Sequence, residues 1–394
     1  MSTNGVATPP PALLKLPWKN QQPIKGLYVL GRVLSLLLLV PSWSLYYLLA
    51  KKPRASWTVG QSVAVCALRW IVPLNAECGL SPDSVSKVNP PSEFKESSLI
   101  WMEPANEKLV RGLAKDERVR PVKVPGYVWP RGKGLDDDDA QEGFVALFIH
   151  GGGYMMGNGT ENFGELDIAR KLLNKNPSIK RLLSVEYRLV GDECHPAQLL
   201  DGLAAYSYLL RTAKVNPSRI ILIGACSGGH LSMMLLRYLY EEKVLPLPAA
   251  LMLFAPVLDM VTDFEIVQGL STHRESASID WLTTSHYANV RFLGHNSPDL
   301  LKSPAIASNR APSGSYTGYP PTFVSIGDAD LLLAEIEQLV KTMQDDRVDV
   351  VLDIQKDGVH HFLSIPFMPT DGAREDAIKK AVKWVGSLEK RVAS

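Results

Sequence analysis

One twelve-residue segment constrains the fold of this chain more than any other. Residues 220–231 read IILIGACSGGHL, an apolar run followed by small residues and then by the start of a helical pattern. A buried strand that turns sharply into a helix needs small residues at the turn, because the two elements approach each other too closely for larger side chains. The residue at the apex of such a turn is a candidate catalytic nucleophile.

The turn fits the nucleophile pattern G-x-S-x-G in two registers, and the register decides the chemistry. In the first register, Gly224 and Gly228 flank Cys226, two positions before it and two positions after it. In the second, Ala225 and Gly229 flank Ser227. A cysteine attacks as a thiolate, whereas a serine hydroxyl needs a base to activate it. The residue types alone leave both Cys226 and Ser227 as candidates.

A second glycine-rich turn lies upstream. Residues 144–149 read FVALFI, a short apolar run typical of a central parallel strand, and HGGGY follows directly. Gly151, Gly152 and Gly153 let the backbone turn its N–H groups toward one point. Together with the N–H of Ser227, these groups are candidates for an oxyanion hole, which stabilises the negative charge of a tetrahedral intermediate. The alternative is a plain glycine turn.

With these two motifs the chain resembles the hormone-sensitive-lipase family of α/β-hydrolases, which includes microsomal arylacetamide and steryl-acetate deacetylases. The resemblance runs from about His150 to Phe362, over half the chain. The family elbow G-D-S-A-G-G-N-L is similar to G-A-C-S-G-G-H-L here, with Gly224 and Gly228 in register only when Cys226 is the nucleophile. The resemblance implies an α/β-hydrolase fold: a mostly parallel central sheet, helices on both faces and a helical lid.

The resemblance also implies an acid and a histidine after the nucleophile. The strand-like run 322–326 leads into GDADLL, where the family's G-x-x-D-x-L falls on Asp330, with Asp328 as the competing carboxylate. A later strand-like run leads into GVHHF, where the family's H-G-F falls on His360. His361 stands where the family has glycine, which leaves open which histidine is the base. The acid would fix the tautomer of the base, which would deprotonate the nucleophile.

The implied activity is that of a carboxylic-ester hydrolase, which acts on a small hydrophobic ester through an acyl-enzyme and needs neither a metal nor an organic cofactor. Cys226 favours a second interpretation, because a thiolate leaves a tetrahedral adduct more readily than an alkoxide does. That interpretation is a non-hydrolytic acyltransferase, cyclase or isomerase of small-molecule biosynthesis with a Cys-His-Asp triad. A third is a non-catalytic ligand-binding protein, which the presence of His360 disfavours.

Composition supports a single enzyme-sized domain, which we place at residues 106–394. A chain of 394 residues that is 46% hydrophobic can bury a large core. The formal net charge of +1 and the lack of a basic stripe argue against a nucleic-acid partner. The four cysteines, Cys66, Cys78, Cys194 and Cys226, lack metal-ligand spacing, although Cys66 and Cys78 could pair in a disulfide. The composition leaves the oligomeric state open.

The N-terminal region predicts a membrane-associated segment. Residues 1–25 are Pro-rich and polar, which is typical of a flexible tail. The apolar segment 26–50 has the length of a membrane-spanning helix, in which Pro41 would be a tolerated kink. The alternative is an apolar lid helix, with residues 51–105 as linker and lid. We therefore expect a membrane location. If the protein is like the microsomal deacetylases, this membrane is that of the endoplasmic reticulum. Lysines on both sides of the segment leave its orientation open.

Overall fold

The computed structural model describes residues 21–78, 94–260, 280, 286–365 and 371–393 of the chain. Its centre is an eight-stranded sheet with the order β1-β2-β4-β3-β5-β6-β7-β8. Strand β2 is antiparallel to both of its neighbours, and all other adjacent strands are parallel. The strands are β1 (Ser98–Met102), β2 (Val124–Trp129), β3 (Phe144–Ile149), β4 (Ile179–Val185), β5 (Ile220–Ala225), β6 (Ala250–Phe254), β7 (Thr322–Gly327) and β8 (Val350–Gln355). The expected mostly parallel sheet is confirmed.

The central strands are continuous apolar runs because both faces of the sheet are covered. Every residue of β3, β5, β6 and β7 is buried, whereas β8, at the edge, alternates between buried and more exposed positions. An alternating pattern is expected only where one face meets solvent. The central strands therefore read from the sequence as parallel strands and carry the functional loops at their carboxyl ends.

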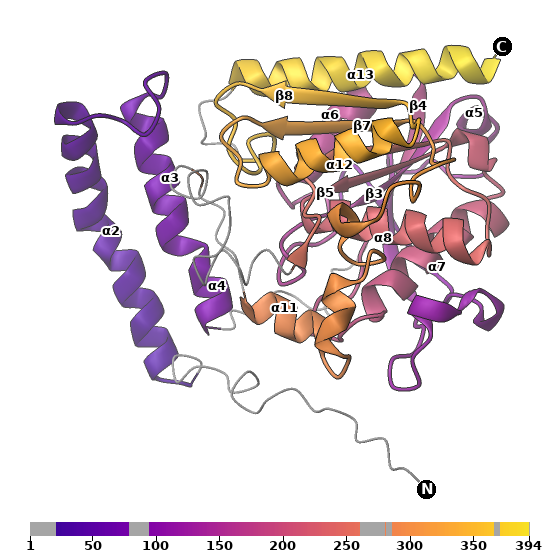
Figure 1. The fold of residues 1–394 in the computed structure, drawn as a ribbon, viewed down its shortest axis with the longest axis horizontal. Helices are drawn as coiled ribbons and strands as arrows, with labels where there is room; N and C mark the ends of the chain where they lie inside the picture. Colours follow the sequence, from indigo (N-terminus) through magenta and orange to yellow (C-terminus); the bar gives the residue numbers. More distant parts are fainter. Residues whose placement is uncertain (1–20, 79–93, 261–279, 281–285, 366–370, 394) are drawn as a thin grey trace, which may run out of the picture.

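Helices form a layer on each face of the sheet (Figure 1). Side chains of α7 (Ala197–Arg211), α8 (Ser227–Glu242) and α12 (Leu333–Asp345) pack into one core, and those of α6 (Leu166–Lys175) and α13 (Asp371–Ala393) pack into the other. The other helices that the structure describes in this domain are α5 (Asp138–Gln141) and α11 (His286–Leu293), with 3₁₀ turns at 107–109, 112–114, 217–219, 298–302 and 308–310. Helices on both faces confirm the α/β-hydrolase architecture.

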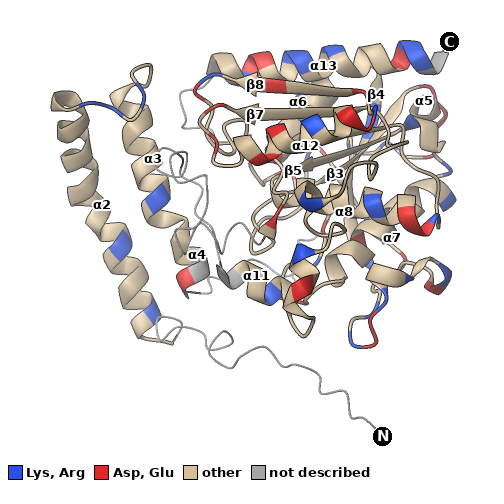
Figure 2. Ribbon diagram, viewed as in Figure 1, with Lys and Arg blue, Asp and Glu red and all other residues tan. Residues whose placement is uncertain are grey.

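In the described N-terminal part of the chain, the helices α2 (Ile24–Leu49), α3 (Val59–Ile71) and α4 (Pro73–Cys78) stand beside this domain (Figure 1). Helix α2 packs against α3, and the Arg32 guanidinium lies over the Trp70 ring, 3.9 Å from its centroid. The one charge that interrupts the apolar run therefore faces protein. The outer side of α2 is apolar and exposed, with Leu37 and Leu38 at 73% and 76% exposure, and Figure 2 shows no charge along its second half.

Helix α2 is the one helix in the described part of the chain that is long and apolar enough to cross a membrane. Membrane anchors, signal sequences and buried core helices share this length and composition, but none of the apolar window of α2 is buried in the protein. The N-terminal apolar helix is thus present as expected. The lid expected from residues 51–105 includes residues 79–93, which lie outside the described residues.

The connection between α2 and α3 touches the loops after β7 and β8. Trp57 is 1% exposed and packs with Ala329 and Val359. Arg54 forms an ion pair with Asp357, with Nη1 and Oδ1 3.0 Å apart. The N-terminal helices are therefore fixed to the two loops in which the acid and the histidine were expected.

The four cysteines are free thiols, so the disulfide considered for Cys66 and Cys78 is not formed. Cys66 lies in α3, and Cys78 lies several helical turns further along the chain, at the end of α4. A disulfide needs its two Cα atoms to be about 4–7 Å apart. The Cys66 thiol instead contacts the Tyr47 hydroxyl of α2 at 3.4 Å. This thiol joins the two helices without a covalent bond.

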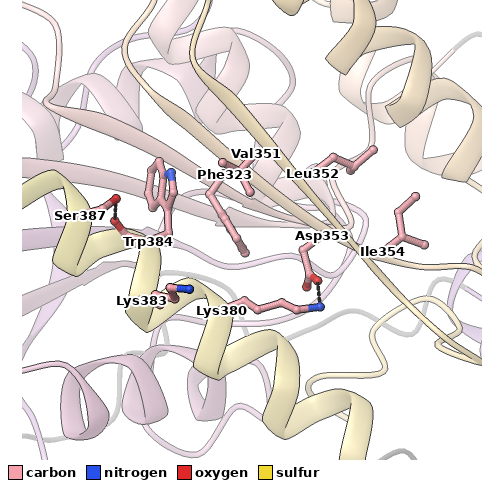
Figure 3. Close-up of a pocket in the computed structure, with 9 residues that line it drawn as sticks. All are labelled: Phe323, Val351, Leu352, Asp353, Ile354, Lys380, Lys383, Trp384 and Ser387. Carbon is pink, nitrogen blue, oxygen red and sulfur yellow. Dashed lines mark hydrogen bonds and ion pairs between the residues drawn. The ribbon is translucent and has the colours of Figure 1, made fainter.

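A hollow of about 440 Å³ lies between the edge strand β8 and α13 (Figure 3). Lys380 of α13 reaches Asp353 of β8, with Nζ and Oδ1 2.8 Å apart. None of the expected site residues lines this hollow. The expected site residues lie instead in the loops at the carboxyl ends of β3, β5, β7 and β8, around the start of α8.

Candidate functional site

The turn between β5 and α8 places Cys226 at its apex. Cys226 has φ 50° and ψ −118°, and Ser227 is the first residue of α8. A non-glycine residue in such a conformation costs about 1–3 kcal/mol and is typical of functional sites. A Cβ atom at Gly224 would lie 2.4 Å from the Gly228 carbonyl oxygen, and one at Gly228 would lie 2.1 Å from that of Ile149. The close approaches thus require glycine at the two positions that flank Cys226.

The Ser227 side chain lies elsewhere. Its Oγ accepts the backbone N–H of Tyr154 at 3.2 Å, and the residue is 2% exposed. The hydroxyl also interacts with the Tyr187 phenol. Ser227 is therefore engaged in packing the glycine loop against α8.

His360 lies between an acid and the thiol. Its Nδ1 is 3.0 Å from Asp330 Oδ2, and both side chains are fully buried. Cys226 lies on its other side, with the thiol sulfur and a ring nitrogen of His360 within 4.8 Å of each other. Burial lowers the pKa of His360, but the Asp330 carboxylate and the Cys226 thiol outweigh it and hold this pKa well above its ordinary value. The structure thus brings Cys226, Asp330 and His360 together.

The competing carboxylate, Asp328, is used differently. Its Oδ1 accepts the backbone N–H of Asp357 at 2.7 Å and also receives Arg54. It therefore fixes the loop after β7 to the loop after β8 and to the N-terminal helices, and Asp330 alone of the two pairs with the histidine ring.

Asp280 is a site residue that sequence analysis missed. Its Oδ2 accepts the N–H of Leu331 at 2.8 Å, and its Oδ1 accepts the N–H of His360 at 3.2 Å. Burial, and then the nearby charge of Asp330, raise its pKa to about 7. This carboxyl ties the backbone of the acid loop to that of the histidine loop. A single aspartate in a polar stretch carries no sequence signal for such a role.

The three glycines of the loop after β3 use their N–H groups differently. Gly151, expected in the oxyanion hole, donates its N–H to Glu165 Oε2 at 2.5 Å, so this N–H is used elsewhere. Gly152 and Gly153 have φ values of 105° and 61°, and their N–H groups donate to no other residue that the structure describes. A Cβ on Gly152 would lie 2.0 Å from the Met156 carbonyl oxygen. The geometry leaves Gly152, Gly153 and Ser227 as the candidate donors.

Glu165 is a second residue that sequence analysis missed. His361, at the family's glycine position, has φ 58°, and its Nδ1 is 3.2 Å from Glu165 Oε1. Burial raises the pKa of Glu165 to about 7, and burial together with His360 lowers the pKa of His361 well below its ordinary value. The rings of His360 and His361 meet edge to face, with centroids 4.4 Å apart. Glu165 precedes α6 without any motif that would have singled it out.

Cys226, His360 and His361 also place one thiol and two ring nitrogens within 4.8 Å of one another. Such atoms can bind a soft metal ion, and they can equally transfer protons. In this centre each imidazole already pairs with a carboxyl group, His360 with Asp330 and His361 with Glu165. The arrangement is suited to holding a thiolate next to an imidazolium.

Comparison with known proteins agrees with this geometry. A family model described as "alpha/beta hydrolase fold" matches residues 146–364, more than half of the chain. An acetyl-hydrolase of Streptomyces hygroscopicus is 28% identical over 195 residues, which is 49% of this chain and 59% of that protein. An ethyl acetate hydrolase of Pseudomonas putida is 28% identical over 233 residues, 56% of this chain and 68% of that protein. The matches thus span about three fifths to two thirds of these curated relatives.

Solved structures agree in fold. A hormone-sensitive lipase from a metagenome library superposes with a TM-score of 0.56 at 22% identity and covers 82% of this chain and 98% of that chain. The comparisons confirm the resemblance to hormone-sensitive-lipase-like proteins. The sheet order, the glycine-bounded turn and the family match lead to one conclusion: the chain belongs to the alpha/beta hydrolase fold family.

Proposed function

We propose that this protein is a thiol-dependent carboxylic-ester hydrolase, which acts on a small hydrophobic ester through a thioester acyl-enzyme. The observation that carries the proposal is Cys226 at the apex of the turn, paired with the buried His360 and Asp330. The relatives named acetyl-hydrolase and ethyl acetate hydrolase support an ester substrate.

The steps follow from the placement of the groups. His360 holds the thiol proton, so Cys226 attacks as a thiolate; a C–S bond forms and the carbonyl oxygen takes the electron pair. The N–H groups of Gly152, Gly153 and Ser227 stabilise that oxyanion. The ester C–O bond then breaks, and His360 gives its proton to the leaving alkoxide. Water attacks the thioester and passes a proton to His360, the C–S bond breaks, and the thiolate returns.

The thiol also sets the choice of substrate. A thiolate is expelled from the tetrahedral adduct in preference to a simple alkoxide, so unactivated alkyl esters are poor substrates, and activated esters and thioesters are better ones. Cys226 therefore favours a second candidate function, in which an alcohol, an amine or a group of the substrate itself resolves the thioester. Analysis of the products with and without an added alcohol acceptor separates hydrolysis from such acyl transfer.

Brief incubation with p-nitrophenyl acetate is expected to add one acetyl group to the protein, and peptide mapping is expected to locate it on Cys226. The thioester accumulates because an activated ester acylates the thiol faster than water resolves it. Pretreatment with iodoacetamide should prevent acetylation, and EDTA should leave it unchanged, because the proposed chemistry needs no metal. An acetyl group on Ser227 instead would overturn the proposal.

We propose further that the outer face of α2 rests against a lipid bilayer. This face is apolar and exposed, whereas the inner face packs on α3 with Arg32 over Trp70. A helix that keeps this packing lies along the membrane surface, where its leucines enter the acyl region. A hydrophobic ester would then reach the catalytic loops from the membrane, because α3 is fixed to those loops.

The protein is expected to float with phosphatidylcholine vesicles in a density gradient, and the double variant Leu37→Glu/Leu38→Glu is expected to remain at the bottom. Each carboxylate at the apolar face opposes membrane entry by about 2–3 kcal/mol. Ile354→Glu, at an exposed position of β8, is the matched control and should float normally. Flotation of the double variant would contradict the proposal, and resistance to carbonate extraction would show a spanning helix instead.

A further inference from the structure

A second carboxyl–imidazole pair lies against the catalytic thiol and is not used by the steps above. We propose that Glu165 and His361 are positioning residues, which hold the glycine loop after β3 and the histidine loop after β8 in register around Cys226. The inference rests on the proposed function, because it concerns how the same thiol centre is held together.

The contacts of Glu165 carry the proposal. One carboxyl oxygen receives the Gly151 N–H at 2.5 Å, and the other lies 3.2 Å from the His361 ring. The residue is 4% exposed. A Cβ on Gly151 would lie 2.6 Å from the Glu165 carboxyl and 2.9 Å from the Cys226 Cβ, so these three residues are in close contact. One side chain thus joins the loop of the oxyanion hole to the residue next to His360.

His361 fits this role because its position otherwise favours glycine. Its φ of 58° lies in the left-handed region, where a side chain costs free energy that glycine avoids. The ring gains a partner in Glu165 and packs edge to face on His360 at 4.4 Å. The contact with Glu165 explains why His361 keeps an unfavourable backbone conformation. The contact with His361 explains why the Glu165 carboxyl is buried.

Burial favours the neutral form of both groups of the pair. The neutral carboxyl is favoured by burial, with its pKa at about 7, and the neutral imidazole is favoured because the pKa of His361 lies well below its ordinary value. A neutral acid can donate its O–H to His361 Nδ1 while its carbonyl oxygen accepts the Gly151 N–H. The ring proton of His361 is then on Nε2, so the pair holds one tautomer.

Ionisation of Glu165 would change the centre. The titratable groups around it are His361 and His360 from the histidine loop, the Cys226 thiol from the turn, and the Tyr187 phenol that follows β4. Above about pH 7 a carboxylate would stand beside the loop that must stabilise an oxyanion, and like charges oppose each other. The acylation rate should therefore fall as Glu165 loses its proton.

The test compares Glu165→Gln, Glu165→Ala and His361→Gly with the wild type, all in the full chain. The two readouts are the pH dependence of kcat/KM for p-nitrophenyl acetate and the rate at which iodoacetamide alkylates Cys226. Glu165→Ala and His361→Gly should each lower kcat/KM by about 10²-fold through kcat, since a small displacement of the oxyanion donors has this effect. Alkylation of Cys226 should change by only a few fold, because its pairing with His360 is intact.

Glu165→Gln is the decisive variant, because glutamine keeps the shape and the acceptor for Gly151 but cannot ionise. It should retain most of the activity, and the fall in kcat/KM above about pH 7 should disappear. Glu161→Gln is the matched control: Glu161 accepts the N–H groups of Lys95 and Glu96 in the same region but does not contact the thiol, so its pH profile should equal that of the wild type. The double variant Glu165→Ala/His361→Gly should lose no more activity than either single variant.

Each outcome has one meaning. An unchanged pH profile in Glu165→Gln, or additive losses in the double variant, would overturn the positioning role while Cys226 remained essential. Retained activity in Cys226→Ala would instead overturn the proposed function. Isosteric Glu165→Gln keeps the inference testable if Glu165→Ala fails to fold.

Discussion

Replacement of Cys226 by alanine is expected to lower kcat/KM for p-nitrophenyl acetate by at least about 10³-fold, because it removes the atom that forms the acyl-enzyme. Replacement of Ser227 by alanine is expected to keep kcat/KM within about tenfold of the wild type. The Ser227 backbone N–H remains in that variant. The hydroxyl's contacts with the Tyr154 N–H and the Tyr187 phenol are lost, and each such bond contributes about 1 kcal/mol of stability.

Steady-state kinetics of the two variants and of Cys226→Ser, with thermal unfolding to confirm that each is folded, check this prediction. Cys226→Ser should shift the preference from thioesters toward oxygen esters, because the alkoxide is the poorer leaving group. Full activity in Cys226→Ala together with loss of activity in Ser227→Ala would mean that the hydroxyl attacks. The φ of 50° at Cys226 and the close approaches at Gly224 and Gly228 are the reasons to expect the opposite.

Replacement of Asp330 by asparagine is expected to lower kcat about 10²- to 10⁴-fold at neutral pH. The Asp330 carboxylate opposes the effect of burial and holds the pKa of His360 well above its ordinary value. Without this charge, burial is expected to lower that pKa below its ordinary value, so at pH 7 the imidazole is neutral and no imidazolium stands beside the thiol. Alkylation of Cys226 by iodoacetamide at pH 7 should then be slower than in the wild type.

The same shift predicts how stability depends on pH. A histidine with a raised pKa in the folded state stabilises the protein fully below its ordinary pKa of about 6.5, and this stabilisation is lost as the pH rises through the folded value. The difference in stability between the wild type and Asp330→Asn should therefore be largest in mildly acidic solution and should narrow as the pH increases. Unfolding by urea at several pH values measures it.

Asp328→Asn is the matched control for Asp330→Asn. It changes a carboxylate in the same loop that pairs with Arg54 and Asp357 but not with the histidine ring. The alkylation profile of Cys226 should stay that of the wild type, although the contact with the N-terminal helices is weakened. If alkylation of Cys226 slows equally in both variants, the cause is a disturbed loop and not the lost charge beside His360.

The local pattern of the sequence determined the elements that frame this centre. The runs that become β3, β5, β6 and β7 could be read because a strand buried on both faces is mostly apolar. The glycine-rich turns could be read because each is one continuous motif in the chain, although the close approach of Gly228 to Ile149 exists only in the fold. The same holds for α2, whose length and composition are properties of one continuous segment.

The tertiary structure decided which side chains meet. It placed Cys226 at the apex and Asp330 beside His360, the residues that the family resemblance favoured, and it gave the Gly151 N–H to Glu165, which the sequence did not indicate. It also added Asp280 across the backbones of two loops. The physical reason is that each of these contacts joins residues far apart in the chain, and burial, distance and pKa arise only when the fold has brought them together.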